Sequence, residues 1–152
     1  MVDTKDCVIK WPILRLIKDI TIWPKIQDKK AKKAIKSYGN ENLQPSDVFL
    51  IIDNTIFRSA KQGAFMTHDR LFGFSEYSGK FSIKLDEIKT LKPEIKRPLK
   101  IPLFGITINE DYFLSLPGLN QLITEGEESQ AALVIFALFI AANWGCELID
   151  EE

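Results

Sequence analysis

Four residues of the types that hydrolases use in catalysis fall within residues 49–74, FLIIDNTIFRSAKQGAFMTHDRLFGF: Asp53, Ser59, His68 and Asp69. Nucleophilic catalysis needs a serine beside a histidine base, a carboxylate that orients the base, and donors that hold an oxyanion. Ser59 lacks the flanking glycines of a nucleophile elbow. His68 and Asp69 fall in the polar segment THDR, which is typical of a turn between strands. We therefore expect no catalytic residues and no enzymatic activity, and an enzyme centred on His68 is the alternative.

Metal and cofactor motifs are also missing from the sequence. It contains no phosphate-binding glycine motif and no HExxH or EF-hand pattern. Cys7 and Cys146 stand near opposite ends of the chain without partners at metal-ligand spacing, so they are expected to be free thiols. Asp53 and Asn54 are interpreted as turn caps at the end of a strand. The sequence thus predicts neither a metal nor a cofactor.

The composition is that of one ordinary globular domain. The chain has 152 residues, of which 45% are hydrophobic and 27% charged. The longest apolar run, residues 131–142, is shorter than the roughly 18 residues that span a bilayer. Asp3 and Asp6 stand where a secretory signal would carry basic and apolar residues. We expect a cytoplasmic location.

The net charge of −1 conceals a division along the chain. All twenty Lys and Arg residues lie within residues 1–100, which have a net charge of +8, whereas residues 101–152 have a net charge of −9. Such a division can guide binding to a partner or to a second copy of the chain. The alternative is that the two segments complement each other within one molecule.

Two helices are predicted before residue 47. The first covers residues 11–22, where Pro12 suits a first helical turn and apolar residues recur at helical spacing. The second covers residues 28–38, with Asp28 as a suitable N-cap and Gly39 as a residue able to adopt positive φ. Its polar face is basic and is either solvated or suited to anionic lipid. This face consists of Lys29, Lys32, Lys33 and Lys36.

Short strands separated by turn residues are predicted from residue 48 onward. Their expected ranges are residues 48–53, 63–67, 71–74, 81–85, 88–94, 99–108 and 112–116. Pro93, Pro98 and Pro102 indicate edge or bulge positions. A last helix is predicted over residues 127–144, with Asn143 and Gly145 ending it. Because this helix is apolar nearly all round, it is either buried on several sides or partly an oligomer interface.

The segment IIDNTIFRSAKQGAFMTHDRLFGF resembles the first three strands of bacterial pleckstrin-homology-like (PH-like) and GRAM-like domains. In those domains an apolar strand ends in an Asp-rich turn, a glycine precedes a strand ending in Thr, and a polar turn leads to a basic residue and an aromatic strand. The order of about seven strands and a final helix over residues 48–144 extends the resemblance. It implies an α+β fold, with a bent antiparallel β-sandwich or barrel capped by the C-terminal helix and preceded by N-terminal helices. The family also implies a binding module, with phosphoinositide or peptide ligands in some members.

We therefore divide the chain into an N-terminal helical extension (1–46), a PH-like domain (47–145) and an acidic tail (146–152). The expected function is binding to a protein partner or to a second copy, motivated by the divided charge and the apolar last helix. The alternative is a peripheral membrane module that binds anionic lipid. Nucleic-acid binding is not expected, because no aromatic residues interleave the lysines. The residues expected to contact an anion or lipid are Lys29, Lys32, Lys33, Lys36, Arg58, Lys61 and Arg70.

Overall fold

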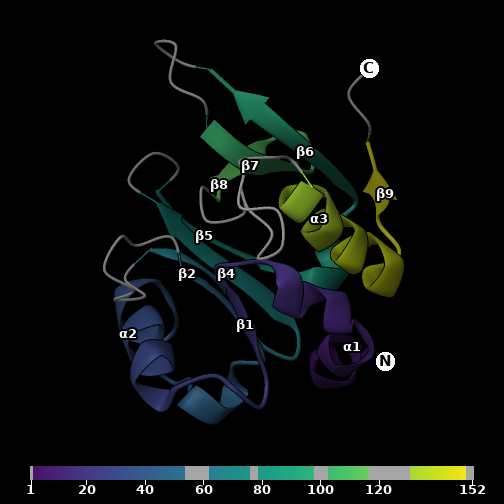
Figure 1. The fold of residues 1–152 in the computed structure, drawn as a ribbon. Helices are drawn as coiled ribbons and strands as arrows, with labels where there is room; N and C mark the ends of the chain where they lie inside the picture. The colour runs from purple at the N-terminus through teal and green to yellow at the C-terminus, as the bar shows by residue number, and fades with distance from the viewer. Residues whose placement is uncertain (1, 54–61, 76–78, 98–102, 117–130, 150–152) are drawn as a thin grey trace.

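The computed structural model describes residues 2–53, 62–75, 79–97, 103–116 and 131–149. Within these ranges the fold is α+β, as the sequence predicts (Figure 1). The α-helices are α1 (Thr4–Lys10), α2 (Asp28–Tyr38) and α3 (Ala131–Trp144), and short 3-10 helices are η1 (Pro12–Leu16), η2 (Pro45–Asp47) and η3 (Leu85–Glu87). The strands are β1 (Ile20–Ile22), β2 (Leu50–Asp53), β3 (Gly63–Met66), β4 (Arg70–Ser75), β5 (Gly79–Lys84), β6 (Thr90–Lys96), β7 (Leu103–Ile108), β8 (Tyr112–Ser115) and β9 (Glu147–Leu148).

The strands form two sheets. The first sheet has the order β1-β2-β3-β4-β5, and all its neighbours are antiparallel. The second sheet has the order β8-β7-β6-β9, in which β9 runs parallel to β6. In the described part of the chain the two sheets do not join into a closed barrel, so the barrel alternative is wrong. The parallel β6–β9 pair also makes the second sheet mixed, where an antiparallel arrangement was expected.

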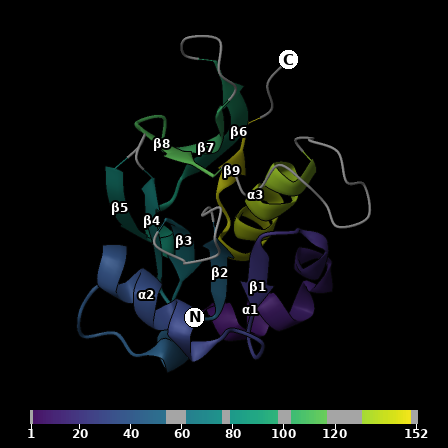
Figure 2. The same ribbon diagram turned by 60° about the vertical axis from the view of Figure 1, so that its left-hand side comes forward.

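Hydrophobic clusters cover both faces of the first sheet. On the outer face, α2 packs against a cluster that includes Ile51 and Phe65. On the inner face, Leu50 and Ile52 join the main core, which also contains residues of α1, η1, the second sheet and α3. Figures 1 and 2 show α2 on one side of the first sheet and α3 on the other, beside β6 and β9. Because both faces are covered, β2 is buried along its whole length and reads as a continuous apolar run.

The predicted helix over residues 11–22 is wrong. In its place the chain forms η1, which begins at Pro12, and then β1 at the edge of the first sheet. The Asp53 N–H donates to Asp19 O at 3.0 Å, and the Trp23 N–H donates to Phe49 O at 2.9 Å. Hydrogen bonds to the backbone of β2 and of Phe49 thus hold this segment in a strand conformation. A short helix gains little stability from helix propensity alone. The pairing with β2 therefore decides the conformation of residues 20–22.

The predicted helix over residues 28–38 is confirmed as α2. Its N-cap residue is Gln27 and Asp28 is its first helical residue, one position away from the expected N-cap. Gly39 is the C-cap residue and adopts a φ of −96°, so its ability to adopt positive φ is not used here. A β-carbon at Gly39 would lie 2.8 Å from Phe65 Cζ and 2.9 Å from Ile35 Cα. Glycine is needed here for a close approach between α2 and β3.

All seven predicted strands occur as β2 to β8, although 99–102 of the sixth predicted strand lie outside the described residues. The sequence did not predict β1 or β9 as strands. The predicted last helix is confirmed from Ala131 onward as α3. Gly145 has a φ of 72° and its N–H donates to Ala141 O at 2.9 Å, which ends the helix as expected.

Pro93 explains why β9 is short. The Glu147 N–H donates to Lys89 O and the Ile149 N–H donates to Leu91 O, each at 2.8 Å. Alternate residues of β6 therefore direct their backbone groups toward β9, and the next residue in this alternation is Pro93. Pro93 has no N–H to donate, so the pairing cannot continue in the same form. β6 lies between β7 and β9, so it is not an edge strand, but Pro93 comes after the two β6 residues that pair with β9 and its side toward β9 has no ladder partner in the described ranges. Pro98 and Pro102 lie outside the described residues.

The N-terminal segment shares its core with the rest of the fold. Val8 of α1, Leu14 of η1 and Ile20 of β1 are buried in the same cluster as Phe136 of α3. β9 lies within the predicted acidic tail. The boundaries at residues 46 and 145 stay predictions. In the described ranges, every helix is too short or too polar to cross a membrane.

Candidate functional site

The candidate catalytic residues do not come together. Asp53 pairs with Gly63 at one end of the β2–β3 ladder, whereas His68 follows Met66 at the other end. The three steps of β3 between these ends rise about 10 Å. Asp53 therefore cannot orient the His68 ring. Ser59 lies outside the described residues.

His68 and Asp69 form the expected turn between β3 and β4. The Thr67 N–H donates to Arg70 O at 3.0 Å, and the Arg70 N–H donates to Thr67 Oγ1 at 3.2 Å. The Thr67 hydroxyl thus satisfies a backbone amide of the turn. The His68 and Asp69 side chains are 67% and 52% exposed, with 3.8 Å between His68 Nδ1 and Asp69 Oδ1. Thr4 Oγ1 donates to the His68 carbonyl at 2.9 Å and so ties α1 to this turn.

Asp53 takes part in a buried polar group beneath α2. Its side chain is 4% exposed, and its Oδ2 lies 3.5 Å from Lys30 Nζ. The hydroxyl of the neighbouring Tyr38 is buried and has no hydrogen-bond partner among the described residues. Burial, and to a smaller degree the negative charge of Asp53, raises the pKa of Tyr38 well above its ordinary value. The sequence analysis missed Lys30, because helical spacing alone does not show that one lysine of a basic helix reaches a buried carboxylate.

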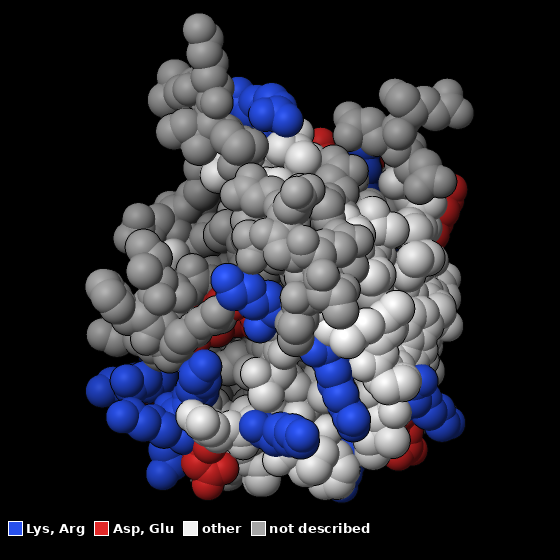
Figure 3. All heavy atoms as spheres, viewed as in Figure 1, with Lys and Arg blue, Asp and Glu red and all other residues white. Residues whose placement is uncertain are grey.

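The predicted basic face of α2 is present. Lys29, Lys32 and Lys36 are exposed, Lys33 is half-buried, and none of the four forms an ion pair with a described residue. Figure 3 shows Lys and Arg atoms gathered along the lower part of the molecule, including the region of α2. These four residues form one surface, as the sequence indicates.

The other residues predicted to contact an anion are Arg58, Lys61 and Arg70. No contact within the described ranges links them to the basic face of α2. Arg70 lies on the face of the first sheet that also carries Phe72, and its Nη1 donates to Ser82 Oγ at 3.0 Å. Arg58 and Lys61 lie outside the described residues.

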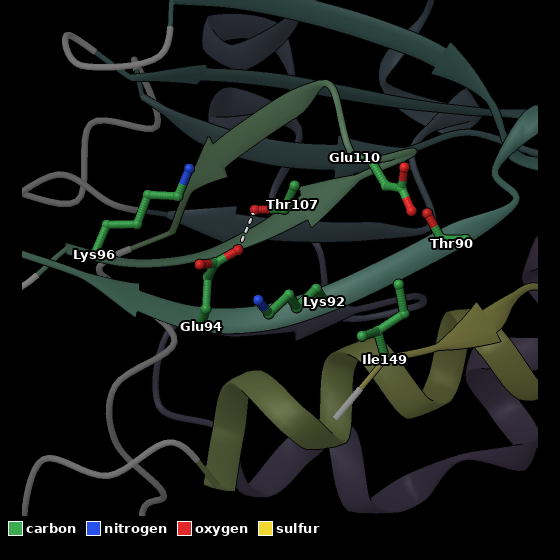
Figure 4. Close-up of a pocket in the computed structure, with 7 residues that line it drawn as sticks. All are labelled: Thr90, Lys92, Glu94, Lys96, Thr107, Glu110 and Ile149. Atoms are coloured by element: carbon green, nitrogen blue, oxygen red, sulfur yellow. Dashed lines mark hydrogen bonds between the residues drawn. The ribbon is translucent and has the colours of Figure 1, made fainter. Parts of the chain in front are cut away.

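A pocket of about 390 Å³ lies on the outer face of the second sheet (Figure 4). Thr107 Oγ1 donates to Glu94 Oε2, and Lys96 Nζ lies 4.6 Å from the centre of the Phe113 ring. The Thr90 hydroxyl is buried and lacks a hydrogen-bond partner in the described ranges. The charged groups alternate in sign, so this surface suits a ligand that carries both charges. Its lining residues are Thr90, Lys92, Glu94, Lys96, Thr107, Glu110 and Ile149.

α3 presents one apolar face to solvent. Leu138 is 42% exposed, and Val134 and Ile135 are half-buried on the same side of the helix. The opposite side, which includes Leu133 and Phe136, is fully buried, so the expectation of burial on several sides is confirmed. Figure 3 shows uncharged atoms over the α3 region on the right. The sequence could not identify the exposed face, because both sides of the helix are equally apolar.

No group of three or more His, Cys, Asp or Glu side chains in the described ranges is arranged to hold a metal ion. Burial raises the pKa values of the Cys7 and Cys146 thiols, which disfavours the thiolates that bind metals. No protein-family model, no curated protein and no solved structure matches the chain.

Proposed function

We propose that the chain is a non-enzymatic binding module with a PH-like fold that acts through protein–protein contact, with a second copy of itself as the partner. The order of four antiparallel strands (β2 to β5), three further strands (β6 to β8) and a C-terminal helix supports the PH-like assignment. The exposed apolar face of α3 carries the functional part of the proposal. No residue of α3 is charged, so an interface on this face desolvates no charge.

A two-fold symmetric contact is the simplest use of this face. In such a contact the same patch lies on both subunits, so Leu138 of each copy packs against apolar residues of the other. α3 has 14 residues and is therefore about 21 Å long, enough for two such helices to cross and pack against each other. Because Val134 and Ile135 are already half-buried, the additional buried area is small. We therefore expect a weak, concentration-dependent dimer.

Light scattering over a wide range of protein concentration tests this proposal. The native chain should change from monomer to dimer as concentration rises, and the Leu138→Lys variant should stay monomeric because it places a charge in the interface. Tyr112→Lys is the matched control, since Tyr112 is 57% exposed on β8, away from α3, and this variant should dimerise like the native chain. A native chain that is monomeric at every concentration overturns the proposal. The proposal is also wrong if the Leu138→Lys variant dimerises to the same extent as the native chain.

A second candidate function is a peripheral membrane module that uses α2. Its supporting observation is that Lys29, Lys32 and Lys36 are exposed and unpaired within the described ranges. Binding to anionic vesicles should then weaken with added salt and on changing these lysines to glutamine. Vesicle binding that is unchanged by both treatments contradicts this candidate.

A further inference from the structure

A small pocket lies along the open edge of β1, the outermost strand of the first sheet. It measures about 220 Å³ and is lined by Arg15, Ile20, Thr21, Ile22 and Lys25. Both charged lining residues are cations. The pocket beside His68 and the pocket on the second sheet each combine acidic and basic side chains. Of these three pockets in the described ranges, the one at the edge of β1 therefore has the lining whose charge favours an anion.

The backbone of β1 adds a donor to this pocket. The hydrogen bonds from Trp23 N–H to Phe49 O and from Asp53 N–H to Asp19 O place the backbone groups of odd-numbered residues toward β2. Backbone groups alternate along a strand, so the Ile22 N–H points away from β2 toward the open edge. Within the described ranges this N–H donates no hydrogen bond outside the sheet, and a backbone N–H in a pocket that is also lined by cations is a typical element of a phosphate site.

The two cations are held from separate elements. Lys25 follows β1 in a turn closed by the hydrogen bond from its own N–H to Ile22 O at 3.0 Å. Arg15 belongs to η1, which precedes β1. Neither side chain forms an ion pair with a described residue, so both charges are available to a ligand.

η1, which supplies Arg15 to this pocket, also carries two exposed aliphatic side chains. A 3-10 helix has three residues per turn, so residues i and i+3 lie on the same side. Leu14 and Ile17 are fully buried, while Ile13 and Leu16 are 43% and 42% exposed. Arg15 occupies the third side and lines the pocket. η1 therefore joins an exposed aliphatic ridge to a cationic pocket.

We propose that Arg15, Lys25 and the Ile22 N–H bind the phosphate group of an anionic phospholipid while Ile13 and Leu16 enter the apolar boundary of the bilayer. Apolar side chains that penetrate beside cations that hold the headgroup are the usual chemistry of an interfacial anchor. A free phosphate ester would use the cations and the N–H but not the aliphatic ridge. The site is separate from the α3 face on which the proposed function depends, so either proposal can fail alone.

Co-sedimentation with phosphatidylcholine vesicles, with and without phosphatidylserine, tests the cationic part. The native chain should bind only the vesicles that contain phosphatidylserine. The Arg15→Gln/Lys25→Gln variant should bind them about tenfold or more weakly. Lys80→Gln/Lys84→Gln is the matched control, which removes two exposed charges from β5, at the opposite edge of the first sheet, and should retain most of the binding. Loss of binding in this control with retention in the Arg15/Lys25 variant overturns the proposal.

Two further measurements separate a lipid from a free phosphate ester. Ile13→Ser/Leu16→Ser should lose vesicle binding but keep the shift of the Ile22 amide NMR signal on adding inorganic phosphate. If this variant binds vesicles as the native chain does, or if phosphate leaves the Ile22 signal of the native chain unmoved, the proposal is wrong. Leu138→Lys should bind vesicles like the native chain, and this outcome distinguishes the site from the α3 face.

Discussion

Gly73 of β4 lies so close to Leu114 of β8 that a β-carbon at Gly73 would be 2.6 Å from Leu114 Cδ1. The next nearest atom, Leu114 Cδ2, would lie at 3.3 Å. A glycine of the first sheet thus makes room for a leucine of the second sheet. Gly73 stands opposite Ala64 in the β3–β4 ladder, so two small residues adjoin at this position. This contact brings the two sheets together near their ends.

Gly73→Ala should lower the free energy of unfolding by about 1–3 kcal/mol, because the added methyl group overpacks the contact with Leu114. Urea unfolding measures this change. Leu114→Val removes the clashing Cδ1 atom, so the double variant should lose less stability than the sum of the two single changes, by about 1 kcal/mol. Ile35→Val, on the opposite face of the first sheet, is the control and should be additive with Gly73→Ala. Additivity with Leu114→Val would contradict the contact.

Lys30→Met should destabilise the chain by about 1–3 kcal/mol, because it removes the ammonium group 3.5 Å from the buried Asp53 carboxylate. Lys30 keeps 27% of its side chain exposed, so we expect a value below that of a fully buried pair. Lys32→Met is the matched control on the same helix, at an exposed position, and should change stability by less than about 0.5 kcal/mol. Equal effects of the two variants in urea unfolding would show that the Lys30–Asp53 pair does not hold α2 to the sheet.

Tyr38 should make the stability of the fold fall at alkaline pH. Its pKa is raised in the folded state, first by burial and then by Asp53. Below about pH 10 the hydroxyl is protonated in both states and the stability is complete. Above that value the unfolded chain ionises first and stability is lost.

The measurement is urea unfolding between about pH 8 and pH 11. Tyr38→Phe should have a smaller loss of stability over this range than the native chain, and Tyr112→Phe, at an exposed position, should have the native slope. At neutral pH, Tyr38→Phe should be as stable as the native chain or more stable, because the buried hydroxyl has no hydrogen-bond partner in the described ranges. An unchanged slope in Tyr38→Phe would contradict the raised pKa.

Local sequence patterns predicted two kinds of element: helices with a regular apolar stripe on one face, and strands bounded by turn-forming residues. α2 was predicted with its observed bounds because its apolar stripe is regular and Gly39 follows it. The order β2 to β8 followed from turn residues between short apolar segments, and THDR is one of these turns. Residues 11–22 were mispredicted because their apolar spacing fits a helix, whereas Pro12 and the pairing with β2 decide the structure.

The candidate binding residues were predictable only where they share one helix. Lys29, Lys32, Lys33 and Lys36 follow helical spacing and do lie on one face. Arg15 and Lys25 meet at one pocket because η1 turns the chain before β1. No periodicity in the sequence shows this turn, so their pairing could not be predicted.

The sequence by itself determined the α+β class, the strand order from β2 to β8 and the helix that follows, because turn residues and apolar periodicity act between near neighbours. Tertiary structure alone decided that residues 20–22 form an edge strand, that Leu138 faces solvent while Leu133 does not, and that Lys30 reaches Asp53. Each of these outcomes depends on which segment, distant in the sequence, packs against the residue or pairs with its backbone. The residue types and spacing within one short segment do not specify that distant partner.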